Sequence, residues 1–198
     1  PAIYSFNDVE GFRLRLGVRT LPVFNERNMF ETYGAYGFKD KEWKYLFAFT
    51  HSFNKNFLTN PQNRILFSYQ HETIFPGQDL QFLNDDNFLL SFKRGFSDQM
   101  IFFDSYKIDY NKESHSGFAY NIIAEHKKQA PLGRLKFETN GSGQTEISAI
   151  NTDAIDVNLR FAPNEQFYQG KNFRLPIPNK YPIFKLNYRQ GFKNVING

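Results

Sequence analysis

The sequence predicts an all-β protein, an antiparallel up-and-down transmembrane β-barrel or an incomplete segment of one, with about eight or more strands. Several stretches alternate apolar and polar residues, and successive strand side chains point to opposite faces. Many of these stretches approach the roughly 9–11 residues that a tilted membrane-spanning strand needs. No long stretch with a helical period of 3.6 occurs, so we expect few or no helices.

The alternating stretches follow one another along the chain and define the predicted strands. They cover 9–20, 29–38, 43–52, 64–71, 101–111, 118–128, 146–161 and 181–192. A polar turn at 39–41 joins the second stretch to the third, which is the clearest hairpin signal in the sequence. Residues 134–137 could add a short strand, whereas 54–63 and 162–180 are expected to be loops. Region 72–98 lacks clean alternation and fits a long loop, a short helix or an irregular strand.

One face of the predicted strands is aromatic or aliphatic, which favours contact with lipid. The residues predicted to face lipid are Phe12, Leu14, Leu16, Val18, Tyr45, Phe47, Phe49, Ile65, Phe67, Ile108, Tyr120, Ile122, Val157, Leu159, Phe184 and Leu186. Tyr4, Trp43, Tyr110 and Tyr181 near strand ends suit aromatic girdles at the two membrane interfaces, or else the rim of a soluble β core.

The opposite face is polar and rich in basic side chains. The residues predicted to face the barrel lumen are Arg13, Arg15, Arg19, Lys44, Arg64, Lys107, Asp109, Glu125, Asp156, Arg160, Lys185 and Arg189. The basic residues could line a passage that prefers anions. The favoured alternative is that they pair with Glu31, Asp109, Glu125 and Asp156 across neighbouring strands and fill a narrow interior.

Composition limits the class of protein. The 198 residues suffice for one sizeable domain, so we expect a single barrel domain or barrel segment over 1–198. The net charge of +4 is too small to indicate a nucleic-acid partner, and no binding module of that kind is recognisable. There is no cysteine, which removes disulfides and Cys-based metal sites. The mean hydropathy of −0.57 argues against a helical membrane protein but not against a barrel, where only alternate residues need be apolar.

The sequence gives little support for chemistry. The four histidines, His51, His71, His115 and His126, lack a spacing typical of metal ligands, and His51 and His71 should be staggered rather than opposite. No Gly-x-Ser-x-Gly elbow occurs, 141–143 resembles a loop tip, and 85–86 resembles solvated loop charges. We therefore expect no catalytic residues, no metal and no cofactor.

Several strings carry a family resemblance: VEGFRLRLG (9–17), YGFKDKEWKY (36–45), GFAYN (117–121), EHK (125–127), PLG (131–133), LRFAP (159–163), FYQGK (167–171) and PNKYPIF (178–184). Together they resemble a family of Bacteroidota outer-membrane β-barrel proteins, domain of unknown function 5686. Its members usually carry an N-terminal carboxypeptidase-regulatory-like β-sandwich. The resemblance implies the bacterial outer membrane as location and an internal fragment of a longer protein, which fits a chain that begins at Pro1.

The leading hypothesis is an outer-membrane β-barrel component with a transport, assembly or scaffold role and no chemistry of its own. Its expected partners are the lipid bilayer of the outer membrane and other envelope proteins. A second hypothesis is a soluble β-sandwich that binds a glycan or a protein, whose apolar faces would pack on one another. A third is a lipid-acting barrel enzyme, which requires a Ser or Asp beside His71 or His126 at the membrane rim.

Overall fold

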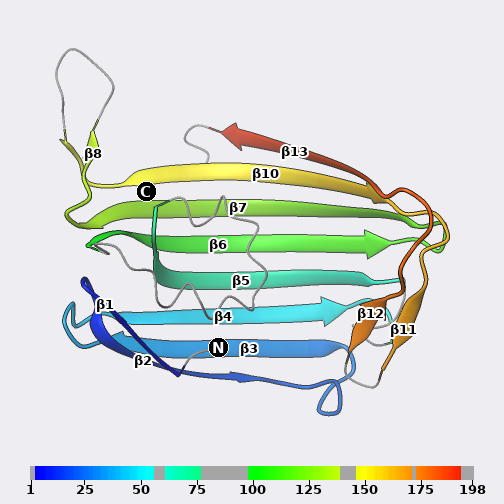
Figure 1. Ribbon diagram of the computed structural model, residues 1–198, viewed down its shortest axis with the longest axis horizontal. Helices are drawn as coiled ribbons and strands as arrows, with labels where there is room; N and C mark the ends of the chain where they lie inside the picture. The colour runs from blue at the N-terminus through cyan, green and yellow to red at the C-terminus, as the bar shows by residue number, and fades with distance from the viewer. Residues whose placement is uncertain (1–2, 56–60, 77–97, 139–145, 171–172, 193–198) are drawn as a thin grey trace.

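The computed structural model describes residues 3–55, 61–76, 98–138, 146–170 and 173–192. The regular structure in these ranges is entirely β-strand (Figure 1). No helix that could cross a membrane occurs among the described residues.

Nine strands form one antiparallel sheet in which almost every strand pairs with its neighbours in the sequence. They are β1 (Tyr4–Asn7), β2 (Gly11–Arg19), β3 (Asn28–Gly37), β4 (Trp43–Ser52), β5 (Asn63–Ile74), β6 (Gln99–Glu113), β7 (Phe118–Gly133), β10 (Ile150–Phe161) and β13 (Phe184–Phe192). Except for β1, each has at least 9 residues, as a membrane-spanning strand requires. β1 and β13 are the two edges of the sheet and do not pair with each other among the described residues. The predicted all-β, up-and-down antiparallel fold is confirmed as an open sheet, which fits an incomplete barrel.

Four short strands form two hairpins outside this sheet. They are β8 (Phe137–Glu138) with β9 (Glu146–Ile147), and β11 (Phe167–Gln169) with β12 (Arg174–Pro176). The prediction of one strand over 146–161 was wrong in detail, because β9 belongs to a hairpin and β10 begins at Ile150. β1 and the β11–β12 hairpin were not predicted, since a strand of three or four residues carries almost no alternation signal.

The tight turn between β6 and β7 depends on a glycine. Gly117 has a φ of 82°, in the left-handed region that other residues rarely adopt. Its N–H donates to the carbonyl oxygen of Ser114 at 3.1 Å. A Cβ atom at Gly117 would lie 2.2 Å from the carbonyl oxygen of Ala162, so the neighbouring connection also requires glycine here.

The long connections fall at both ends of the sheet. The β5–β6 and β7–β10 connections lie at one end and the β10–β13 connection at the other (Figure 1). The first residues of region 72–98 are strand, because β5 continues to Ile74. Residues 77–97 of that region lie outside the described residues.

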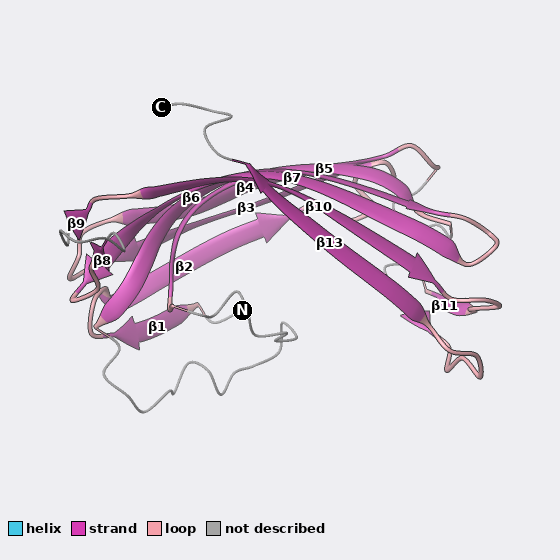
Figure 2. Ribbon diagram, turned by 90° about the horizontal axis from the view of Figure 1, so that it is seen from above, coloured by secondary structure: helices cyan, strands magenta, loops and turns pink. Residues whose placement is uncertain are grey.

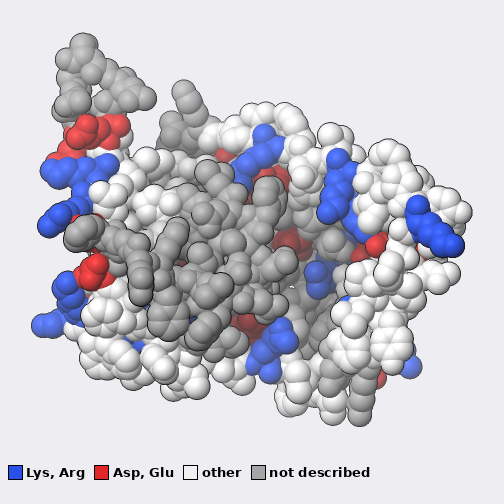
Figure 3. Space-filling view, in the orientation of Figure 1, with Lys and Arg blue, Asp and Glu red and all other residues white. Residues whose placement is uncertain are grey.

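The sheet is arched rather than flat. Seen from above, its middle strands form the crown, and both β2, at left, and β13, at right, slope downward from it (Figure 2). Lys, Arg, Asp and Glu side chains occupy the side toward which the arch opens, which faces the viewer in Figure 3. Charged side chains are thus present on the concave face, as they are in the interior of a barrel.

Candidate functional site

The strand register separates the two sets of predicted residues onto two faces. Directly paired residues of neighbouring strands share a face, so a face can be followed from β2 to β13. Every residue predicted to face lipid lies on one face, called the apolar face below, and every residue predicted to face the lumen lies on the other, the polar face. Their contact with lipid or with a lumen stays a prediction.

Large side chains on the apolar face are exposed. Leu16, Phe47 and Leu186 keep 74%, 57% and 61% of their surface accessible. Of the described residues, only two-stranded hairpins lie outside the main sheet, and none forms a layer that covers this face. Within the described ranges, therefore, no second sheet packs on the apolar face to form a sandwich.

On the polar face, by contrast, several charged and polar side chains are buried. Lys44, Ser52, Glu72 and Ser105, all on this face, are buried. In a water-soluble antiparallel sheet, the apolar face packs on the core and the polar face meets water. This chain shows the reverse: large side chains on the apolar face are exposed, whereas several polar side chains on the polar face are buried.

The exposed apolar residues form a band that runs obliquely across the strands. One row of paired residues is apolar in β2 and β4, at Leu16 and Tyr45, and becomes polar in the later strands. Its polar members are His71, Asp104, Lys128 and Asn151. A second row, nearer the other end of the sheet, is polar in β5 and β6 and becomes apolar in the later strands. It begins with Asn63 and Lys112 and continues with Tyr120, Leu159 and Leu186.

The slope of this band can be estimated from strand geometry. Its residues on β2 run from Phe12 to Val18, and those on β7 run from Phe118 to Ala124. In the paired register, the two groups are displaced by about eight residues, or about 26 Å, over five strand spacings of about 4.8 Å. The apolar band therefore crosses the strands at about 45°, a slope close to the strand tilt of membrane barrels.

Aromatic rings gather near both borders of the band. Trp43 lies 5.0 Å from the ring of Tyr36, and Phe12 lies between Tyr4 and Phe38 at 6.3 and 5.8 Å. Toward the other border, the rings of Tyr110 and Tyr120 are 5.9 Å apart. The predicted girdle residues Tyr4, Trp43 and Tyr110 lie in these groups, whereas Tyr181 lies in the β10–β13 connection.

A cluster of buried charges occupies the polar face where the β1–β2 turn meets β4 and β5. The charged cluster consists of Glu10, Arg13, Asp40, Lys44 and Glu72. Lys44 Nζ lies 3.0 Å from Glu10 Oε1 and also contacts Asp40. Arg13 Nη2 donates to Glu72 Oε2 at 2.7 Å, and Arg13 Nη1 lies 3.5 Å from Glu10 Oε2.

Neutral side chains complete the hydrogen bonding of this cluster. The hydroxyl of Tyr33 donates to Glu72 at 2.7 Å, and the hydroxyl of Thr73 donates to Glu10 at 2.9 Å. Burial alone would raise the pKa of Glu10, but Arg13, a hydrogen bond from Asn7, and Lys44 together hold this pKa below its ordinary value. The cluster fixes the β1–β2 turn on the polar face.

Other basic residues of the polar face are paired as well. Arg189 lies 3.3 Å from Glu125 and 3.5 Å from Asp156, two of the carboxylates predicted as partners. Arg160 binds Glu165 through two hydrogen bonds of 2.6 and 2.5 Å. Arg15 lies over the ring of Tyr33, 3.7 Å from its centroid.

As predicted, basic residues of the polar face pair with carboxylates, but most of these carboxylates are not the predicted ones. Glu10, Asp40 and Glu165 come from turns, and Glu72 lies three strands away from Arg13. Sequence alternation identifies the face on which a residue lies but not its partner. Sequence reasoning therefore missed these carboxylates, and no motif marks them.

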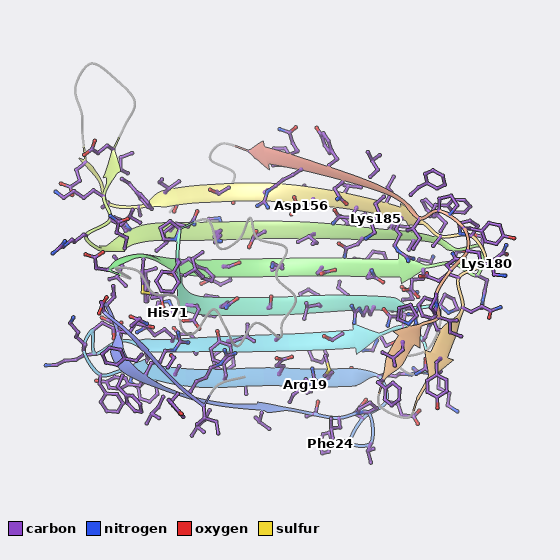
Figure 4. All side chains as sticks on the ribbon, viewed as in Figure 1. Arg19, Phe24, His71, Asp156, Lys180 and Lys185 are labelled. Carbon is purple, nitrogen blue, oxygen red and sulfur yellow. The ribbon has the colours of Figure 1, made fainter. Side chains whose placement is uncertain are left out.

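Two histidines on the apolar face pair with aspartates at one border of the band. Nδ1 of His71 lies 2.5 Å from Asp104, and Nδ1 of His126 lies 2.6 Å from Asp153. Tyr69 also donates to Asp104, at 2.9 Å. His71 lies toward the β8 end of the sheet (Figure 4).

The remaining histidines are apart from this group. His51 contacts Asn28 at 2.7 Å, and it pairs with Ile65 rather than with His71, as the expected stagger requires. His115 lies in the exposed β6–β7 turn. Over the described ranges, no three His, Asp or Glu residues are grouped closely enough to hold a metal ion. The sequence features at 85–86 and 141–143 lie outside those ranges.

Comparison with known proteins gives one match. The model for the C-terminal domain of a family of unknown function (DUF5686) matches residues 1–198. Neither the curated proteins nor the solved structures contain a match to this chain. The match spans the whole chain, and the resemblance in the sequence strings points to the same family. The chain thus belongs to the DUF5686 family, and its sequence matches the C-terminal domain of that family.

Proposed function

We propose that this chain is part of the wall of a bacterial outer-membrane β-barrel, with its apolar face against lipid and its polar face toward the interior. Its role is transport, assembly or scaffolding, without chemistry of its own. The observation that carries the proposal is the uncovered, oblique apolar band backed by a buried polar face. In a barrel the strands tilt by about 35–45°, so a band level with the membrane must cross them obliquely.

Energetics support lipid over water as the neighbour of the apolar face. Each buried apolar Å² contributes roughly 25 cal/mol, and the exposed side chains include Phe30, Phe47, Phe67, Phe184 and Leu186. A contiguous apolar surface on a soluble monomer seldom exceeds a few hundred Å². Here the surface extends from β2 to β13, and hydrocarbon tails would satisfy it without any second protein layer.

The interior supports a scaffold or gated role more than a wide open pore. The charged cluster occupies the polar face beside the β1–β2 turn, and carboxylates balance its basic groups. Moving such a cluster requires breaking several ion pairs together. The exposed strand edges β1 and β13 would close against further strands or other envelope proteins, since an open edge of this length invites pairing.

The soluble β-sandwich hypothesis needs a layer over the apolar face, and the described residues supply none. The lipid-acting enzyme needs a Ser or Asp beside His71 or His126, and an Asp lies beside each. However, no described serine hydroxyl bonds to either imidazole. We infer that both His–Asp pairs are structural, so replacing both histidines by alanine should leave any lipid hydrolysis by the protein unchanged.

Cell fractionation and detergent extraction test the proposed location. The protein should sediment with the outer membrane, resist extraction by salt or carbonate, and dissolve in detergent as a β-rich species. Its electrophoretic mobility should change on heating, as for folded membrane barrels. A monodisperse, stable monomer that stays in solution without detergent would contradict the proposal.

A further inference from the structure

A polar hollow of about 510 Å³ lies on the polar face, at the end opposite the charged cluster. The ends of β6, β7, β10 and β13 form its floor, and the β11–β12 hairpin forms its side. Its volume is within the range of small-molecule sites, which are largely preformed.

The floor carries a row of asparagines on four neighbouring strands. Asn111, Asn121, Asn158 and Asn187 are paired in register across β6, β7, β10 and β13. The Asn158 amide donates to Asn121 at 3.0 Å, and the Asn121 amide donates to Asp109. A row of primary amides presents both donors and acceptors to the same space.

Two arginine–carboxylate pairs hold the side of the hollow in place. Arg174 of β12 donates to Glu113 of β6 at 2.9 and 3.2 Å, and its guanidinium lies 3.5 Å from the centroid of the Phe167 ring. Arg160 and Glu165 form the second pair. These bidentate contacts fix the hairpin against the sheet, so the hollow exists without a ligand.

Three groups in the hollow have unused binding capacity. The Oδ1 atom of Asn111 is buried and accepts no hydrogen bond from any described group, although buried polar atoms are normally satisfied. Asn187 and Lys185 line the hollow from the edge strand β13. Within the described part of the chain, no hydrogen bond or ion pair involves either side chain.

The chemistry of these groups specifies a complementary ligand. A hydroxyl can donate to the side-chain oxygen of the exposed Asn187 and accept from its amide N–H, so a polyhydroxylated molecule suits the row. Three cationic side chains and two carboxylates line the hollow, and both carboxylates are already paired with arginine. The ammonium of Lys185 is therefore available for an anionic group.

We propose that this hollow binds an acidic saccharide, a sugar that carries a carboxylate or a phosphate. Its hydroxyls bond to the asparagine row, and its anionic group lies at Lys185. The site lies on the polar face and needs no bilayer, so it is independent of the proposed membrane location.

Binding to the purified full chain tests the site, with galacturonate and glucose 6-phosphate as probes and galactose and glucose as neutral counterparts. Titration calorimetry in detergent, or in buffer if the protein proves soluble, should give saturable binding of at least one acidic probe. Its affinity should exceed that of its neutral counterpart by about tenfold, because the anionic group adds a charge-assisted hydrogen bond to Lys185. The preferred acidic probe distinguishes carboxylate from phosphate.

Two variants and two matched controls locate the binding. Lys185→Gln should abolish the preference for the acidic sugar, and Asn187→Ala should weaken acidic and neutral sugars alike by several-fold. Lys180→Gln in the β10–β13 connection and Asn151→Ala on the opposite face of β10 should leave affinity unchanged. Figure 4 shows Lys180 at the end of the sheet and Lys185 on β13.

Both test residues are exposed and have no described partner, so their replacement should preserve the fold, which circular dichroism verifies. The proposal is overturned by absence of saturable binding, by equal affinity for acidic and neutral sugars, or by test variants that bind like their controls. None of these results bears on membrane location, which the fractionation experiment tests separately.

Discussion

Phe47 and Lys44 lie on the same strand, three positions apart, and the structure treats them in opposite ways. Phe47, on the apolar face, is 57% exposed, whereas the side chain of Lys44, on the polar face, is 0% exposed. In a protein dissolved in water these values would be exchanged. The difference is what the proposed barrel wall requires, with one face toward lipid and the other toward a polar interior.

The largest expected effect is on the polar face. Lys44→Ala would leave the buried Asp40 without its cation and the buried Glu10 with Arg13 alone, at a cost of about 3–5 kcal/mol in the free energy of unfolding. Urea titration in detergent micelles measures this change. Lys107→Ala, on the same face but without a described ion pair, is the control and should cost less than about 1 kcal/mol. Equal losses of stability in the two variants would show that the buried charged cluster does not stabilise the fold.

A charge in the apolar band should have the next largest effect. Val157→Arg should reduce the stability of the lipid-inserted protein by about 2–4 kcal/mol, the penalty for arginine at mid-membrane depth, because Val157 pairs with Ile122 inside the band. Asn151→Arg lies on the same strand and face but outside the band, and should cost about 0–1 kcal/mol. Both are measured by denaturant titration in phospholipid vesicles. Similar costs at the two positions would contradict the border of the band.

The β6–β7 turn sets the register that separates the faces, because a slip of one residue exchanges them. Gly117→Ala should cost about 1–3 kcal/mol, since alanine disfavours the φ of 82° and would collide with Ala162. Gly34→Ala is the matched control, because a Cβ there meets no atom within 4 Å. Thermal unfolding in detergent measures the loss of stability in both variants. A loss in Gly34→Ala as large as that in Gly117→Ala would contradict the claim that the β6–β7 turn specifically requires glycine.

Acid should weaken the attachment of the β1–β2 turn, and this is the smallest effect. The pKa of Glu10 is lower in the folded chain than its ordinary value of 4.5. A lowered carboxyl pKa contributes stability above pH 4.5, and this contribution disappears as the pH falls through the folded-state pKa. Unfolding free energy measured between pH 6 and pH 3 should therefore fall less steeply in Glu10→Gln. If the unfolding free energy of the variant fell as steeply with pH as that of the unchanged chain, Glu10 would not be a cause of the acid sensitivity.

The sequence was sufficient to predict the two faces, because alternation with a period of two depends only on neighbouring residues. Phe12, Leu14 and Leu16 could be assigned to one face without any knowledge of pairing. The slope of the band could not be predicted, because it depends on the register among the six strands from β2 to β7.

The partners of the buried charged residues could not be predicted from the sequence either. The arch brings Glu72 of β5 to Arg13 of β2 across two intervening strands, and the β1–β2 turn brings Glu10 to Lys44. The asparagine row was overlooked for the same reason, since its members are isolated residues until pairing aligns them.

The most direct test of the central claim uses spin labels at two positions of one row. The chain has no cysteine, so Leu16→Cys and Lys128→Cys give unique labelling sites. Both positions lie in the row that begins in the apolar band and ends outside it. In vesicles, a label at 16 should collide with lipid-dissolved oxygen, and a label at 128 with a water-soluble nickel chelate. Equal accessibility at both positions, or nickel contact at 16, would contradict an oblique band held in the bilayer.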